Sequence, residues 1–190
     1  MKQIRAFIAI KLTSDIVQTL VQIQTKIKLK NNVAVKWVEP ENIHITLKFL
    51  GDTDEELIDN VEEVIKKSCK NINPFNIMLK SSGVFPNYNY IKVVWIGIEN
   101  IEKLVKISGG IDDGTSKFGF EKEKRKFSAH LTIGRVKSAK NKDRLLKIIN
   151  KYSDVEFGNI DVKSIKLKKS ELTPKGPIYT TITEVKLGEK

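Results

Sequence analysis

Two short stretches of this chain repeat one pattern of residues, at 44–47 (HITL) and at 130–133 (HLTI). Together they contain both histidines of the 190-residue sequence. Side chains of an extended strand alternate between two faces, so residues two positions apart share a face. Each stretch therefore predicts a strand that buries its two aliphatic residues and presents one imidazole and one hydroxyl together on the opposite face.

The paired histidines, His44 and His130, predict a site for acid–base chemistry. An imidazole titrates near neutral pH, so one ring can donate a proton while a second accepts one. A single His-x-Thr triplet in a strand is more often only a hydrogen-bonded residue. Two copies that use every histidine of the chain favour the catalytic interpretation, in which the two strands face each other across one groove.

The formal net charge of +11 favours a polyanionic partner, of which nucleic acid is the commonest. Dispersed lysines are equally typical of a solvated surface, so charge agrees with phosphate chemistry without establishing it. Cys69 is the only cysteine and the histidines lack neighbouring ligands at metal spacing, so we expect no disulfide, no metal and no cofactor. Without a long apolar run or a signal-like N-terminus, we expect a cytoplasmic protein that does not enter a membrane. Nothing in the sequence suggests an obligate partner, so we expect a monomer.

The order of elements predicts an α+β fold built from a duplicated unit. Alternating patterns predict strands at about 4–12, 33–38, 43–50, 75–84, 91–98, 126–136, 155–168 and 178–187. Helical spacing predicts helices after Ser14 and Asp54, from about 101, and over 140–152, with glycines and aspartates at 109–114 weakening the third into a loop or frayed end.

The interval of 86 residues between the histidines carries strand onto strand and helix onto helix. We therefore predict a single domain of two pseudo-symmetric lobes, with repeat units at roughly 1–88 and 89–190. Antiparallel sheets would line a central groove, and helices would pack on the outside.

The sequence resembles the two-histidine (2H) phosphoesterase superfamily, whose mark is a pair of His-x-Thr-x motifs, and within it the RNA 2′,3′-cyclic phosphodiesterases, historically called 2′-5′ RNA ligases. The segments that carry the resemblance are 5–10 (RAFIAI), 44–51 (HITLKFLG), 83–86 (GVFP), 94–97 (VWIG), 130–135 (HLTIGR) and 172–179 (LTPKGPIY). The resemblance implies metal-free hydrolysis of cyclic phosphate ends of RNA or oligonucleotides. It also implies that His44 is the proton donor and His130 the proton acceptor, with Thr46 and Thr132 bonding the phosphate oxygens.

Arg135 lies five residues after His130, so strict alternation would turn it away from the groove. Gly134 could host a β-bulge that re-aims it toward phosphate, and we predict this irregularity. Phe49 occupies the equivalent position of the first motif, where we expect a core residue rather than a platform for a base.

Lys48 shares the face of His44 under strict alternation, so it is a candidate for ligand contact. Tyr88, Tyr90 and Tyr179 could each stack on a base. Among them we select Tyr179, because it lies in the family-like tail.

Two alternatives remain open at this point. An enzyme of the same fold could run in the joining direction and make 2′-5′ linkages, although the chain has no glycine-rich nucleotide loop to supply energy for ligation. A non-catalytic RNA-binding protein could use the basic groove, but it would not need both histidines. Near-symmetric motifs do not reveal from physics alone which histidine is the acid.

Overall fold

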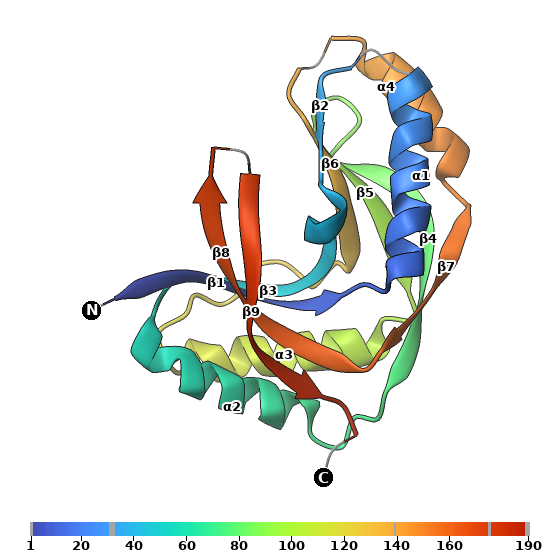
Figure 1. Ribbon diagram of the computed structural model, residues 1–190. Coiled ribbons are helices and arrows are strands. Elements are labelled where there is room, and N and C mark those ends of the chain that lie inside the picture. Colours follow the sequence, from blue (N-terminus) through green and yellow to red (C-terminus); the bar gives the residue numbers. More distant parts are fainter. Residues whose placement is uncertain (1, 31–32, 139, 175, 189–190) are drawn as a thin grey trace.

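The computed structural model describes residues 2–30, 33–138, 140–174 and 176–188, which form an α+β fold (Figure 1). In chain order, the described elements are β1 (Gln3–Lys11), α1 (Ser14–Lys30), β2 (Val35–Trp37), η1 (Pro40–Asn42), β3 (His44–Asp54), η2 (Glu55–Leu57), α2 (Ile58–Cys69), β4 (Phe75–Pro86), β5 (Ile91–Glu99), α3 (Glu102–Ser116), β6 (His130–Val136), α4 (Lys142–Ile149), η3 (Asn150–Tyr152), β7 (Glu156–Val162), β8 (Ser164–Thr173) and β9 (Gly176–Lys186). No described helix is both long and apolar enough to span a bilayer.

The strands of the described chain form one sheet in the order β7-β4-β5-β6-β3-β1-β8-β9, with β2 paired to β6. Every pairing is antiparallel. Adding 86 to the residue numbers carries β3 onto β6, β1 onto β5 and β4 onto β8. The two members of each pair lie at equal distances on either side of the β6–β3 contact in the sheet. The duplicated, two-lobed architecture is therefore confirmed. Each lobe also exchanges one strand, because β4 pairs with β5 and β8 pairs with β1.

The helices cover the sheet on the side away from the groove. In Figure 1, α1 and α4 lie against one lobe, and α2 and α3 lie side by side beneath the other. The apolar stripe of α1 is buried as its spacing predicts, at Ile16, Leu20, Ile23 and Ile27. The central strand β1 is buried over five consecutive residues, 6–10, because it is covered on both faces.

The third helix, α3, corrects the prediction that glycines and aspartates would fray it. It continues without a break to Ser116 because its glycines make close helix packing possible. A Cβ on Gly114 would lie 2.5 Å from a methyl of Val64 on α2, and one on Gly110 would lie 2.9 Å from the Ser68 hydroxyl. The gain from packing α2 against α3 offsets the helix propensity that glycine lacks.

Candidate active site

The two histidine strands meet at a single pair of buried residues, Ile45 of β3 and Leu131 of β6. Continuing this antiparallel register places His44 across from Thr132, and Thr46 across from His130. These four side chains flank the buried pair on the opposite face and all line one groove. The prediction that the two motifs share a groove is confirmed.

Both imidazoles are held in the same way. His44 Nδ1 lies 2.7 Å from the carbonyl oxygen of Asn42, and His130 Nδ1 lies 2.7 Å from that of Ser128. Because a carbonyl can only accept, each Nδ1 carries the proton and donates it to this bond. Each Nε2 is then the atom available for chemistry, as an acceptor in the neutral ring and a donor in the protonated ring.

Aromatic rings pack against each imidazole. The ring of His44 contacts Phe7 at 4.9 Å and Tyr179 at 5.3 Å, the latter edge-on, and these two rings also contact each other at 4.8 Å. His130 meets the ring of Phe85 edge-on at 5.1 Å. Burial lowers the pKa of His44 to about 4, the bond to the Asn42 carbonyl opposes this change, and the charge of Lys168 adds to it. Burial also disfavours the charged form of Tyr179, which for a phenol means that its pKa is raised.

The depressed pKa of His44 predicts a stability loss in acid. The unfolded chain binds a proton at this ring near pH 6.5, whereas the folded chain binds it near pH 4. Between these values the unfolded state holds more protons, so the free energy of unfolding falls as pH is lowered, by up to about 3 kcal/mol from this group. We expect urea denaturation at pH 7.5 and 4.5 to show a smaller pH effect in His44→Gln than in the wild type. An equal effect in both proteins would contradict the burial of this ring.

A β-bulge interrupts each histidine strand at equivalent positions. On β6 the register to β5 skips Ile133, and on β3 the register to β1 skips Leu47. The first bulge confirms the predicted irregularity near Gly134, and it turns Arg135 into the groove. The second turns Phe49 into the groove, where it is 65% exposed. The expectation that Phe49 belongs to the core is wrong.

The same bulge also corrects the candidate Lys48. Strict alternation would place Lys48 on the face of His44, but the skipped residue turns it to the other side of the sheet. There it is buried, forms an ion pair with Asp112 of α3, and donates to the carbonyl of Glu121 at 2.8 Å. Lys48 does not line the groove.

Each bulge is stabilised by a buried polar side chain from a helix of the opposite half of the chain. The Ile133 carbonyl accepts from the Gln24 amide of α1 at 2.9 Å, and the Leu47 carbonyl accepts from the Ser108 hydroxyl of α3 at 3.2 Å. The Ile133 carbonyl also accepts from the Val38 amide at 3.1 Å, so Gln24 adds a second bond to it.

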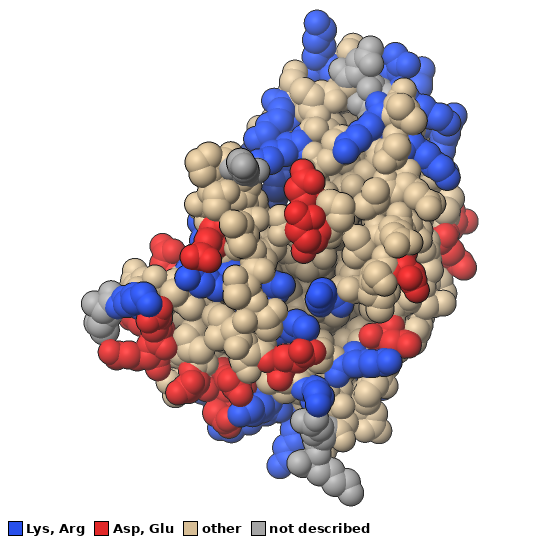
Figure 2. Space-filling model, viewed as in Figure 1, with Lys and Arg blue, Asp and Glu red and all other residues tan. Residues whose placement is uncertain are grey.

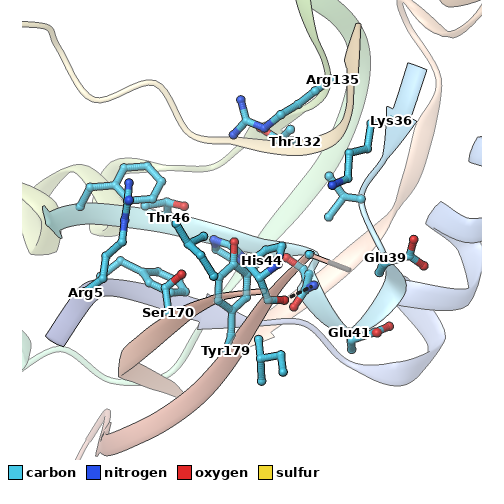
Figure 3. Close-up of a pocket in the computed structure, with 18 of the residues that line it drawn as sticks. Arg5, Lys36, Glu39, Glu41, His44, Thr46, Thr132, Arg135, Ser170 and Tyr179 are labelled. Atoms are coloured by element: carbon cyan, nitrogen blue, oxygen red, sulfur yellow. Dashed lines mark hydrogen bonds between the residues drawn. The ribbon is translucent and has the colours of Figure 1, made fainter. Parts of the chain in front are cut away.

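The groove has a volume of about 1050 Å³. Figure 3 shows Thr46, Thr132, Arg135 and Tyr179 around His44, with two further cations that sequence reasoning missed, Arg5 and Lys36. The tip of the β8–β9 hairpin forms one wall and β2 forms the facing wall (Figure 1). Tyr88 and Tyr90 are exposed and do not line it. Among the described residues, no three His, Cys, Asp or Glu side chains gather as metal ligands.

The chain matches the family model described as LigT-like phosphoesterase twice, over residues 10–95 and 96–179, with one His-x-Thr motif in each copy. It is 47% identical to the RNA 2′,3′-cyclic phosphodiesterase of Methanocaldococcus jannaschii, over 95% of this chain and 99% of that one. It is 41% identical to the enzyme of the same name from Methanothermobacter thermautotrophicus, over 97% of this chain and 100% of that one.

Solved structures show the same fold. A crystal structure of a Thermus thermophilus protein aligns with a TM-score of 0.81 at 27% identity, covering 96% of this chain and 97% of that one. Escherichia coli LigT, crystallised with 3′-AMP, aligns over 99% of this chain and 100% of that one with a TM-score of 0.80 at 20% identity. With the two motifs in one groove and two matches to one model, this chain belongs to the LigT-like phosphoesterase family, within the 2H phosphoesterase superfamily.

Proposed function

We propose that this protein hydrolyses 2′,3′-cyclic phosphate ends of RNA to 2′-phosphates, without a metal ion, by paired histidine acid–base catalysis. The observation that carries the proposal is the pair of imidazoles in one groove, each with Nδ1 bonded to a carbonyl and Nε2 left for chemistry. The names of relatives that share up to 47% of this sequence support the same substrate.

The reaction needs two groups on opposite sides of phosphorus. The oxygen of water attacks phosphorus while the bond from phosphorus to the 3′-oxygen breaks in line. In our assignment, which follows the family resemblance, His130 Nε2 takes the proton of the attacking water. His44 Nε2 gives its proton to the departing 3′-oxygen. The product carries a 2′-phosphate and a free 3′-hydroxyl, and exchange with solvent restores both rings. A positioned acid and a positioned base each contribute about 10²–10⁴-fold.

The hydroxyls of Thr46 and Thr132 and the guanidinium of Arg135 supply donors for the non-bridging oxygens. These oxygens gain negative charge in the transition state, so donors fixed in advance stabilise it more than they stabilise the substrate. Tyr179 packs against His44 and fits a role in holding that ring beside the nucleotide.

The low pKa of His44 sets a condition on its role as donor. With a pKa of about 4, the ring is neutral at pH 7 in the free protein. A bound cyclic phosphate brings a negative charge beside the imidazole, which favours the protonated ring and raises its pKa. For His44 to act as the donor, binding of the substrate must therefore raise its pKa enough for the ring to take up a proton.

The test is to incubate the protein with an oligonucleotide ending in a 2′,3′-cyclic phosphate, in the presence of excess EDTA, and to identify the product. We expect a 2′-phosphate, undiminished by the chelator, with a bell-shaped dependence of rate on pH. Loss of activity in EDTA that added metal restores would refute the metal-free mechanism. A joined 2′-5′ product would favour ligation, and binding without turnover would favour a non-catalytic RNA-binding protein.

A further inference from the structure

Three cations form a cluster where β2 pairs with β6. Lys36 of β2 lies directly opposite Arg135 in the register of the two strands. Lys137 follows Arg135 by two residues, and its amide donates to the Ala34 carbonyl at 2.7 Å, which continues the pairing. All three side chains are exposed and line the groove, and we call them the β2–β6 cation cluster.

This arrangement is unfavourable in the free protein. Like charges directly opposite each other on neighbouring strands repel. Within the described residues, no carboxylate forms an ion pair with Lys36, Arg135 or Lys137. The two acidic residues of this part of the groove are Glu39, the N-cap of η1, and Glu41 within η1, and in Figure 3 they are on the far side of Lys36 from Arg135. An anion placed over the cluster would remove the repulsion.

The cluster extends beyond the site of the reacting phosphate. Thr132 lies beside the histidines, Arg135 follows the bulge, and Lys137 is one further step along the same face. Such a step measures about 6.6 Å, which resembles the spacing of successive phosphates along an extended nucleic-acid strand. Figure 2 shows that lysines and arginines continue over this lobe, around β2, α1 and α4.

We propose that the β2–β6 cation cluster binds the phosphodiester on the 5′ side of the terminal nucleotide, so that the protein prefers oligonucleotide ends to cyclic mononucleotides. This inference rests on the proposed function, which places the terminal cyclic phosphate between the histidines. Arg135 lies at the junction of the two positions, and Lys36 and Lys137 belong to the upstream one. The facing wall, the tip of the β8–β9 hairpin, presents the exposed apolar side chains Leu172 and Ile178 to the groove.

The experiment compares three substrates. The first is a cyclic mononucleotide, and the second is a dinucleotide with the same end and a 2′-O-methyl upstream sugar that prevents internal cleavage. The third is that dinucleotide with a neutral methylphosphonate in place of the upstream phosphodiester. We expect Lys36→Met to lower kcat/KM on the charged dinucleotide by about tenfold, the size of one exposed charge-assisted hydrogen bond, and to leave the other two substrates unchanged. Lys106→Met removes the same charge from an exposed position of α3, outside the groove, and should change none of them.

Binding supplies a readout that does not depend on turnover. Titration calorimetry with the 2′-phosphate dinucleotide should show at least about tenfold tighter binding than with its methylphosphonate form in the wild type. In Lys36→Met this ratio should be about tenfold smaller, because Lys137 and Arg135 still face the charged linkage. Equal losses on all three substrates, or equal wild-type affinity for charged and neutral linkages, would overturn the upstream site. Wild-type protein that binds these ligands selectively but hydrolyses none of them would instead overturn the proposed function alone.

Discussion

Replacing either His44 or His130 with alanine is expected to lower turnover of a cyclic-phosphate-ended oligonucleotide by about 10³-fold or more. In the proposed mechanism each ring carries one of the two proton transfers, and the chain has no third histidine to substitute for it. Product formation under single-turnover conditions measures the loss. Affinity for the 2′-phosphate product should change much less, because Thr46, Thr132 and Arg135 still line the groove in both variants.

The pH profile separates a chemical role from a structural one. The wild type should give a bell-shaped curve, and each variant should lose the limb that its own histidine supplies. Tyr90→Ala is a suitable control, since this ring is exposed outside the groove and its loss should leave rate and profile unchanged. Full activity in either histidine variant would refute the paired mechanism.

A substrate with sulfur at the departing 3′-position assigns the two roles. A thiolate leaves without needing a proton, so such a substrate bypasses the general acid. If His44 is the donor, His44→Ala should recover most of its lost rate on this substrate, whereas His130→Ala should not. Rescue of His130→Ala instead would exchange the two roles and leave the paired mechanism in place.

The sequence predicted those parts of the fold and the site that follow from strand alternation and spacing. The shared groove, the duplicated units and the turn of Arg135 all follow from two motifs 86 residues apart and from Gly134 as the signal for a bulge. The bulge at Leu47 has no such signal, because Lys48 stands where the second motif has Gly134. Its consequences for Lys48 and Phe49 therefore could not be read from residue order.

Other features depended on contacts between distant segments. The glycines of α3 signal a weak helix when taken alone, and only the approach of α2 explains why the helix continues. Lys36 gave no sign of a role, since its significance comes from lying opposite Arg135, which is 99 positions away in the chain. Phe7 and Phe85 pack against the histidines from strands whose partners only the sheet order reveals.

The buried ion pair of Lys48 and Asp112 connects the first histidine strand to the segment that leads into the second. The Lys48 side chain is 1% exposed, and its ammonium bonds both the Asp112 carboxylate and the Glu121 carbonyl. Asp112 also accepts from the Glu123 amide at 3.1 Å. Burial would raise the pKa of Asp112, but the bonds from Lys48 and Glu123 outweigh it and keep the pKa below its usual value.

Asp112→Ala should therefore lower the free energy of unfolding by about 3–5 kcal/mol, because it strands a buried ammonium without a counter-charge. Asp113→Ala is the matched control on the same helix. Its side chain is 71% exposed and pairs with Lys122 at the surface, so the loss should stay below about 1 kcal/mol.

The double substitution Lys48→Met and Asp112→Leu removes both charges and should recover most of the stability that Asp112→Ala loses, since an apolar pair of similar volume replaces a buried ion pair at little cost. Urea denaturation at pH 7 measures all three variants. Equal losses for Asp112→Ala and Asp113→Ala would mean that the Lys48 ammonium reaches water.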